Sequence, residues 1–369
     1  MTVAELAVRL EDLRQRYVPD RRLGVWEVEL DGEGDAPAIT GAVTEPDAIE
    51  ELRALAGEAG VLAAVELLPA AGGELQAIAH RSLAHLRAEP RHAAELVSQM
   101  ILGEEALVLR ARGEWLQVQT GDRYVAWVHH RSIVRRHVGD LASFRTRLFE
   151  RLPPAGRFVV TARGARAVAE PAPYASPVAD LVQGAIVETG ETRGRFLEIR
   201  FADGVSGWVS RSDTVPADRL AQRFTPSGRA IVEHAAQFLG LPYLWGGTSE
   251  KGFDCSGFVQ RLFGLHGVWL PRDSDQQASR GEPIDPGSDW SAIADGDLAF
   301  FAEAGAGRAT HVGILAQGGR LLHASTGRNG VAWDALDPAA GEHDEYAARL
   351  AAMLTGVRRV PLLLAAGRG

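Results

Sequence analysis

The spacing of apolar and polar positions divides the chain into four segments of different character. Residues 1–76 alternate strand-like runs with a helical period over residues 45–60, which indicates a small α/β domain. Residues 77–140 and 156–217 consist of short alternating runs broken by glycine and proline, a pattern typical of small β-barrels. In residues 225–369 helical and strand-like stretches are mixed. The pattern therefore predicts a multidomain α+β protein.

The two barrel segments are copies of one another at a constant offset of 81 residues. "GEWLQV" from Gly113 aligns without a gap with "GRFLEI" from Gly194, and "DRYVAWV" from Asp122 aligns with "DGVSGWV" from Asp203. Repetition at a fixed offset indicates one structural unit that is used twice.

The two copies differ at positions where a ligand could be held. Glu95 and Tyr124 of the first copy correspond to Ser176 and Val205 of the second. Drift on a solvated surface explains these differences as well as a ligand-facing role for the first copy alone, so the pattern leaves both interpretations open.

Composition and charge exclude several classes of protein. The formal net charge of −9 argues against a nucleic-acid or anionic-membrane partner. A single cysteine excludes an intramolecular disulfide and a multi-cysteine zinc site, and the histidines show no metal-ligand spacing, so we expect neither metal nor cofactor. The N-terminal stretch lacks an apolar signal region, and no apolar run reaches the ~18 residues of a membrane span. We expect a cytoplasmic protein.

The single cysteine, Cys255, lies in "GFDCSGFVQRLFGL", whose apolar residues have helical spacing. Asp254 can cap that helix, which places Cys255 in its first turn. There the helix dipole is expected to lower a thiol pKa that starts near ~8.5. A buried, inert cysteine fits the same segment equally well.

Two histidines, His311 in "THVGIL" and His323 in "RLLHAS", lie on apolar strands separated by "AQGGR". A two-residue turn at Gly318-Gly319 would put their side chains on opposite faces, whereas a three-residue loop, Gln317–Gly319, would put them on one face within ~7 Å. Each alone is typical of a core histidine. Two on one face, in the domain of a helix-start cysteine, favour a catalytic base, His311, oriented by His323.

Six short blocks then follow one another over about 115 residues, and their order resembles that of the NlpC/p60 family. The blocks are "LPYLWGG", "FDCSGFV", "PRDSDQQA", "GDLAFF", "HVGIL" and "LLHAS". Members of this family are papain-like cysteine peptidases that act on bacterial cell-wall peptides, so the resemblance implies a papain-like α+β domain over 225–369. The two repeats in front resemble bacterial SH3-like domains. Together they resemble the subgroup of γ-D-glutamyl-L-diamino acid endopeptidases.

The resemblance implies a role for each matching residue. Cys255 would be the nucleophile, His311 the base and His323 the orienting group, with the hydroxyl of Tyr243 and the backbone N–H of Cys255 at the oxyanion. The residues that it implies for lining the substrate site are Asp254, Ser256, Asp273 and Ser274.

In the same subgroup, an acid and a tyrosine from the first SH3-like domain close the site over the free amino terminus of the substrate. Tyr124 matches the tyrosine, and Glu95 is our choice for the acid, with Glu104 as the rival. The resemblance further implies that Asp254 helps to hold this ammonium group.

The implied function is hydrolysis of the γ-D-glutamyl to L-diamino acid bond in murein peptides with a free N-terminal L-Ala, without a cofactor. Two alternatives remain open at this point. One is an amidase or acyltransferase acting on another acyl substrate, and the other is a cell-wall binding protein with an inactive peptidase domain.

Overall fold

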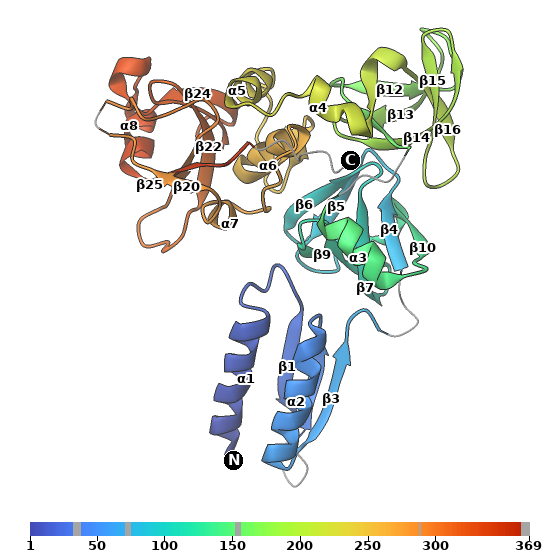
Figure 1. The fold of residues 1–369 in the computed structure, drawn as a ribbon, viewed down its shortest axis with the longest axis vertical. Coiled ribbons are helices and arrows are strands. Elements are labelled where there is room, and N and C mark those ends of the chain that lie inside the picture. Colours follow the sequence, from blue (N-terminus) through green and yellow to red (C-terminus); the bar gives the residue numbers. More distant parts are fainter. Residues whose placement is uncertain (32–37, 71–74, 152–155, 288, 363–369) are drawn as a thin grey trace. The chain divides into compact units, whose positions relative to one another are not determined.

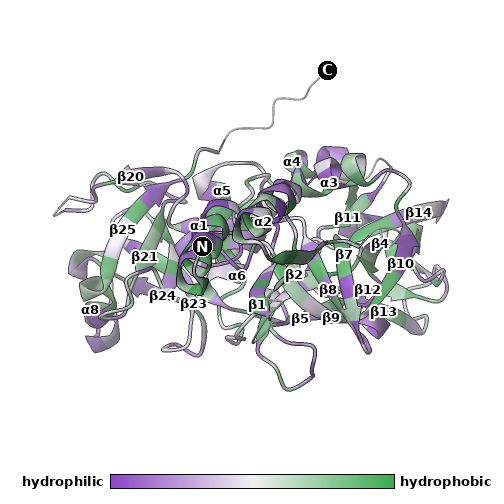
Figure 2. Cartoon of the chain, turned by 90° about the horizontal axis from the view of Figure 1, so that it is seen from below, coloured by the Kyte–Doolittle hydropathy of each residue, from purple (hydrophilic) through white to green (hydrophobic). Residues whose placement is uncertain are grey.

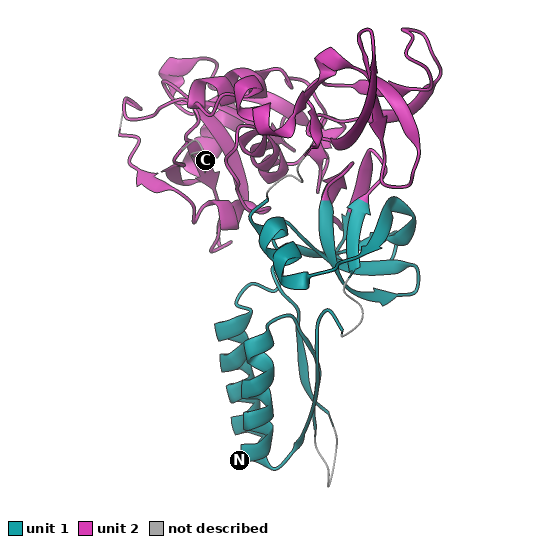
Figure 3. Ribbon diagram, turned by 45° about the vertical axis from the view of Figure 1, so that its right-hand side comes forward, with its two compact units in different colours: residues 1–78, 86–95, 105–152 teal, residues 79–85, 96–104, 153–369 magenta. Residues whose placement is uncertain are grey.

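The computed structural model describes residues 1–369 except 32–37, 71–74, 152–155, 288 and 363–369 (Figure 1). The chain forms two compact units, which Figure 3 distinguishes by colour. Unit 1 comprises residues 1–78, 86–95 and 105–152, and unit 2 comprises residues 79–85, 96–104 and 153–369. No helix among the described residues is long and apolar enough to span a membrane.

The N-terminal domain in unit 1 is the small α/β domain that the sequence predicts. Its elements are α1 (Val3–Tyr17), β1 (Trp26–Asp31), β2 (Ala38–Val43), α2 (Pro46–Ala59) and β3 (Leu62–Leu67). The sheet order is β1-β2-β3, with β1 antiparallel and β3 parallel to β2. Apolar residues of both helices, among them Leu10 and Leu52, pack with Ile39 of the sheet into one core. The periodic pattern of residues 45–60 is therefore a buried helix face.

Both repeats fold as seven-stranded sheets. The first has β4 (Leu75–Ala79), β5 (Leu83–Arg87), β6 (Leu96–Ile101), β7 (Glu105–Arg112), β8 (Trp115–Thr120), β9 (Val125–His129) and β10 (Ile133–His137), with η1 (His130–Ser132) before the last strand. The second has β11 (Phe158–Val160), β12 (Ala165–Val168), β13 (Pro177–Leu181), β14 (Ile186–Arg193), β15 (Phe196–Arg200), β16 (Ser206–Ser210) and β17 (Thr214–Pro216), with η2 (Arg211–Asp213) in the same place.

The order of the strands confirms the internal repeat. The first sheet runs β10-β4-β7-β8-β9-β5-β6, and the second, read from its other edge, runs β17-β11-β14-β15-β16-β12-β13. Each strand thus occupies the place of its partner at the 81-residue offset. Helix α3 (Leu141–Phe149) follows the first repeat. The first strand starts at Leu75, two residues before the predicted boundary of 77.

The C-terminal domain is an α+β domain built on a six-stranded sheet of order β20-β25-β21-β22-β23-β24. Its strands are β20 (Glu282–Ile284), β21 (Leu298–Phe301), β22 (His311–Ala316), β23 (Arg320–Ser325), β24 (Gly330–Ala335) and β25 (Leu354–Arg359), and the short pair β18 (Thr248–Ser249) and β19 (Gly252–Phe253) lies apart from this sheet. Its helices are α5 (Gly228–Ala236), α6 (Cys255–Leu265), α7 (Ser274–Gln277) and α8 (Glu345–Ala352), and α4 (Leu220–Arg223) precedes the domain.

Helix α6 lies against β22 and β23 (Figure 1). Its apolar residues, such as Phe258 and Leu262, are fully buried with Val312 of β22 in the main core of the domain. Figure 2 shows apolar positions along β21 and β23 of the same sheet. Burying that core fixes the first turn of α6 against the beginning of β22, which is where the candidate catalytic residues lie.

Candidate active site

Cys255 is the first residue of α6, as the sequence predicts. Asp254 is the N-cap, and its carboxylate accepts a hydrogen bond of 2.6 Å from the backbone N–H of Gly257. The thiol is 8% exposed and accepts hydrogen bonds from the backbone N–H groups of Val312 and Ser256. The sulfur therefore lies at the start of β22, beside the residue that follows His311.

The expectation of a stabilised thiolate is wrong for the free protein. Burial, followed by the neighbouring carboxylate of Asp254, raises the pKa of the Cys255 thiol to about 12. The N–H groups of Val312 and Ser256 act in the opposite direction without outweighing burial. A helix start lowers a thiol pKa when the sulfur is partly exposed, whereas here desolvation dominates. In the free protein the thiol is neutral, so its proton has to be removed when it attacks.

His311 and His323 lie on one face of the β22–β23 hairpin. Ala316 pairs with Arg320, which leaves the three-residue loop Gln317–Gly319 between the strands. Nε2 of His311 is 2.7 Å from Nδ1 of His323. The three-residue loop is confirmed, and with it the prediction that the two imidazoles meet.

Burial shapes the protonation of both imidazoles. It lowers the pKa of His311 well below its usual value, and the neighbouring His323 lowers it further. The pKa of His323, whose side chain is fully buried, is also lowered by burial although Asp334 opposes the shift. Both rings are therefore neutral at neutral pH, and a neutral His311 is able to accept a proton from the thiol.

One further residue of the site, the acid Asp334, was not predicted from the sequence. Oδ2 of Asp334, on β24, lies 2.8 Å from Nε2 of His323. Ala332 pairs with His323, so Asp334 is the diagonal neighbour of His323 on the same face of the sheet. The alternation of "GVAWDA" over β24 carried this signal, but it could be read only with the register of the β23–β24 hairpin.

Tyr243 lies next to the start of α6 through a bridge to Phe253, two residues before the cysteine. Its ring is partly buried, and burial, followed by the negative charges that Cys255 and Asp254 can carry, raises the pKa of its hydroxyl. The hydroxyl thus stays protonated and can donate a hydrogen bond, and the backbone of Tyr243 lies next to the start of α6. This position suits a donor to an oxyanion that forms on the atom under attack.

Asp254 is engaged in the protein interior. Arg272 is almost fully buried, and its Nη2 lies 2.5 Å from Oδ2 of Asp254 while its Nη1 lies 3.2 Å from Oδ1. The backbone N–H of Gly246 also donates to Oδ2, at 2.9 Å. With the bond from Gly257, these donors occupy both carboxylate oxygens, so the primary role that the structure gives Asp254 is to anchor the start of α6.

The other residues of the predicted substrate site lie around this ion pair. The hydroxyl of Ser256 accepts a hydrogen bond of 2.9 Å from Nη1 of Arg272. Asp273 caps the short helix α7, and Oγ of Ser274 donates to the carbonyl oxygen of Ala309 at 3.1 Å, two residues before His311. The structure thus brings Ser256, Asp273 and Ser274 to the same side of the domain as Cys255. Their contact with a substrate stays a prediction.

Strand β6 of the first SH3-like repeat belongs to the same compact unit as the C-terminal domain. Oγ of Ser98 accepts a hydrogen bond of 3.0 Å from Nε of Arg272. The carboxylate of Glu104, just after β6, accepts two hydrogen bonds. One of 3.0 Å comes from Nη1 of Arg261 on α6, and one of 2.9 Å comes from the backbone N–H of Ile101. Both carboxylate oxygens of Glu104 thus serve structural contacts, which favours Glu95 over Glu104 as the substrate-contacting acid.

The two other predicted contacts lie in unit 1. Glu95 is exposed, and its backbone carbonyl accepts a hydrogen bond of 3.0 Å from Ala88. Tyr124 is buried, with its backbone N–H directed at Asp122 at 3.4 Å. The approach of these two side chains to a substrate stays a prediction.

One cluster in the first repeat approaches metal-ligand geometry, which the spacing of the histidines did not indicate. Ligand atoms of Glu114, His129 and His130 lie within 4.8 Å of one another among the described residues. Pairing of β8 with β9 places Trp115 opposite His129, and this register brings Glu114 close. However, Nδ1 of His129 accepts from the N–H of Arg131, which leaves the proton of a neutral ring on Nε2, the atom that faces the cluster. The cluster is therefore not preorganised for a metal ion.

Comparison with known proteins gives a family match for two of the domains. Residues 240–346 match the model of the NlpC/P60 family, and residues 86–133 match that of the bacterial dipeptidyl-peptidase Sh3 domain. The chain carries an NlpC/P60 domain and a bacterial dipeptidyl-peptidase SH3 domain. The resemblance seen in the six sequence blocks is thereby confirmed.

Relatives of the NlpC/P60 domain have names that describe peptidases. The chain is 45% identical over 124 residues to a gamma-D-glutamyl-L-lysine dipeptidyl-peptidase of Bacillus subtilis; the match covers 33% of the chain and 39% of that relative. It is 27% identical to dipeptidyl-peptidase 6 of Lysinibacillus sphaericus over 77% of the chain and 98% of that relative. Both relatives are named dipeptidyl-peptidases, and the first match spans less than half of that relative's length.

A solved structure shares the fold over most of the chain. A crystal structure of an NlpC/P60 family protein from Bacillus cereus superposes with a TM-score of 0.61 at 22% identity, and it covers 78% of this chain and 100% of its own. The mixed α/β fold of this chain is therefore shared, over most of its length, with a known NlpC/P60 family protein.

Proposed function

We propose that this protein is a cysteine peptidase that hydrolyses the γ-D-glutamyl to L-diamino acid bond of murein peptides with a free N-terminal L-Ala. The observation that carries the proposal is the position of the Cys255 sulfur at the start of β22, with the His311–His323 pair on the same strand pair. The names of the relatives support the choice of bond.

The geometry supports the following reaction. His311 takes the thiol proton as the Cys255 sulfur attacks the γ-carbonyl carbon of D-Glu. The negative charge that forms on the carbonyl oxygen is stabilised by the hydroxyl of Tyr243 and the backbone N–H of Cys255. His311 then gives its proton to the amine of the leaving diamino acid, and L-Ala-γ-D-Glu stays bound to sulfur as a thioester. A water molecule, deprotonated by His311, releases the dipeptide and restores the thiol.

Recognition of the free amino terminus is the second part of the proposal. Glu95 and Tyr124 are proposed to hold the ammonium group of L-Ala, because they occur only in the first repeat and Glu104 is committed to Arg261. Asp254 shapes this end of the site through its buried pair with Arg272. An enzyme that reads the amino terminus cleaves free peptides and leaves intact wall strands alone.

Two peptides test the proposal: L-Ala-γ-D-Glu-diaminopimelate and the same peptide with an acetylated amino group. We expect cleavage of the free peptide between D-Glu and diaminopimelate and a loss of kcat/KM of at least about tenfold on acetylation, since a charged hydrogen bond contributes about 1.5–3 kcal/mol. Equal cleavage of both peptides would refute recognition of the amino terminus, and cleavage of neither would refute the assigned bond.

Variants locate this recognition. Glu95→Gln should raise KM for the free peptide and leave the acetylated one unaffected. Glu89→Gln is the matched control, because Glu89 is an exposed acid near Glu95 that pairs with Arg91 at 3.0 Å. We also propose that the protein acts in the cytoplasm on recycled peptides. Cell fractionation tests this part of the proposal, which expects the protein in the cytoplasmic fraction.

A further inference from the structure

A continuous line of hydrogen bonds runs from the two histidines to a buried acid and beyond. His311 Nε2 meets His323 Nδ1 at 2.7 Å, and His323 Nε2 meets Oδ2 of Asp334 at 2.8 Å. His323 is 0% exposed and Asp334 is 4% exposed, so the contact between these two residues is shielded from bulk water.

Arg328 closes the far end of this line. Its Nε lies 3.0 Å from Oδ1 and 3.2 Å from Oδ2 of Asp334, and its Nη2 also pairs with Oδ1. The same guanidinium binds both oxygens of Asp344, the N-cap of α8, at 2.8 and 2.9 Å. Burial alone would raise the pKa of Asp334, but the hydrogen bonds from His323 and Arg328 outweigh it and hold that pKa below its usual value. Asp334 is thus an ionised acceptor.

An ionised acceptor at this end decides where each proton lies. Because Asp334 can only accept, Nε2 of His323 must carry a proton. A neutral His323 then has a bare Nδ1, which can only accept from His311, so Nε2 of His311 must also carry its proton. This leaves Nδ1 of His311 as the bare nitrogen. It is also the ring nitrogen of His311 that does not face His323.

We propose that Asp334 is a positioning residue that sets the tautomers of His323 and His311 in series, so that His311 offers a bare Nδ1 to the thiol of Cys255. This inference rests on the proposed cysteine-peptidase function. It assigns Arg328 the task of keeping Asp334 charged and in place. It also explains why a histidine can fill the orienting position. An imidazole that donates to the carboxylate through one nitrogen must accept from His311 through the other.

Replacing the carboxylate by an amide should reverse this polarity. The amide group introduced by Asp334→Asn can donate to Nε2 of His323, which moves the proton of His323 to Nδ1. His323 then donates to Nε2 of His311, and His311 carries its proton on Nδ1. A protonated Nδ1 cannot accept the thiol proton, so the pair is locked in the wrong tautomer. The same change in the orienting acid of serine proteases lowers kcat by about 10⁴-fold through the wrong tautomer, and we expect a loss of about 10²-fold or more here.

The test compares the full-length wild type with Asp334→Asn by ¹⁵N NMR of histidine-labelled protein, with His311 assigned through His311→Gln. We expect Nε2 of His311 to be protonated and Nδ1 bare in the wild type, and the reverse in Asp334→Asn. Asp334→Glu, which keeps a carboxylate, should retain the wild-type tautomers. In parallel, kcat for L-Ala-γ-D-Glu-diaminopimelate should fall in Asp334→Asn with little change in KM.

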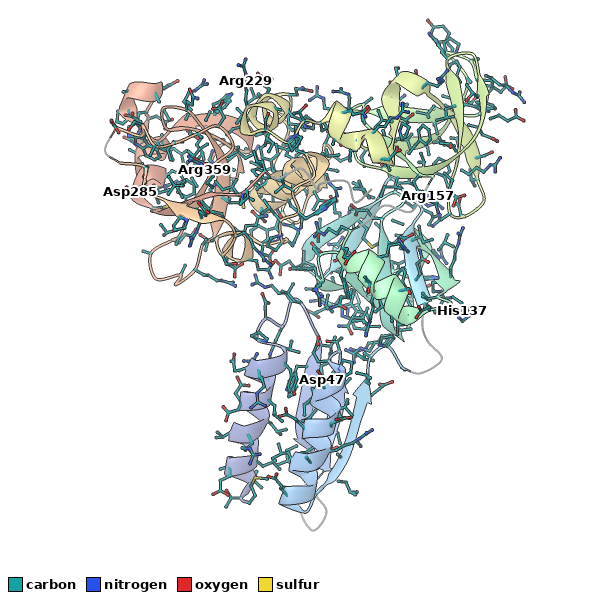
Figure 4. All side chains as sticks on the ribbon, in the orientation of Figure 1. Asp47, His137, Arg157, Arg229, Asp285 and Arg359 are labelled. Carbon is teal, nitrogen blue, oxygen red and sulfur yellow. The ribbon has the colours of Figure 1, made fainter. Side chains whose placement is uncertain are left out.

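Asp297→Asn is the matched control. Asp297 is 2% exposed and pairs, at 2.8 and 2.7 Å, with Arg359 of β25. Strand β25 lies two strands away from β22 in the same sheet (Arg359 is labelled in Figure 4). An unchanged His311 tautomer in Asp334→Asn, or an equal loss of kcat in Asp297→Asn, would overturn the inference. If the wild type does not cleave the peptide, the proposed function fails, while the NMR comparison still decides the role of Asp334.

Discussion

Nε2 of His311 lies 2.7 Å from Nδ1 of His323. The two residues lie on neighbouring strands that a three-residue loop connects. The loop sets this relationship, since a two-residue turn at the same place would direct the imidazoles to opposite faces of the sheet. Gly318 and Gly319 both adopt positive φ angles, of 75° and 77°, which L side chains rarely adopt. The positions of the proposed base, His311, and of its proposed orienting group, His323, thus depend on two glycines in the loop between their strands.

Tyr243→Phe tests the oxyanion donor. The Tyr243 hydroxyl stays protonated. Its loss should lower kcat by about 10²-fold with little change in KM, because a hydrogen bond to the oxyanion strengthens only as negative charge develops. Tyr174→Phe is the control, since Tyr174 is 99% exposed and should behave as the wild type. Equal kcat for Tyr243→Phe and the wild type would remove Tyr243 from the oxyanion site.

The pH dependence of alkylation tests the neutral thiol. Cys255 is the only cysteine, so iodoacetamide reports on it alone. Since burial raises its pKa to about 12, the thiolate fraction and the alkylation rate of the folded protein should still rise from pH ~9 to ~11. In denaturant the same chain should level off near the ordinary pKa of ~8.5. A folded protein that levels off below pH ~8 would show that the free enzyme holds a thiolate.

Arg272→Met tests the anchor of α6. It leaves the carboxylate of Asp254 buried without its cation, and we expect a loss of about 3–5 kcal/mol in the free energy of unfolding. Adding Asp254→Asn should recover part of this loss. Arg229→Met breaks an exposed pair with Glu233 on α5 and should leave the unfolding midpoint unchanged (Arg229 is labelled in Figure 4). The midpoint of urea unfolding decides between them: similar midpoints for Arg272→Met and Arg229→Met would contradict the anchoring role.

The sequence predicted those parts of the molecule that depend on local pattern or repetition. The 81-residue offset predicted two equivalent sheets, and the strand orders agree. Asp254 was predicted as the cap of α6 because capping is a local property, and the hydrogen bond to Gly257 confirms it. The meeting of His311 and His323 followed from parity once the loop length was chosen.

The rest depended on contacts between distant segments. Burial of the Cys255 thiol reverses the effect of the helix start on its pKa, and burial is set by the whole core of the domain. Arg272 and Asp334 were overlooked because single charged residues in a loop and on a strand are usually solvated. Their partners come from other elements, so only the tertiary structure shows that both charges are buried and paired.

The most direct test of the account is the covalent intermediate on Cys255. The full-length protein is mixed with L-Ala-γ-D-Glu-diaminopimelate, quenched with acid within the first turnover and analysed by peptide mapping and mass spectrometry. We predict an L-Ala-γ-D-Glu thioester on Cys255, and neither adduct nor cleavage for Cys255→Ala. Cleavage of the peptide by Cys255→Ala at the wild-type rate would contradict the assignment of Cys255 as the nucleophile.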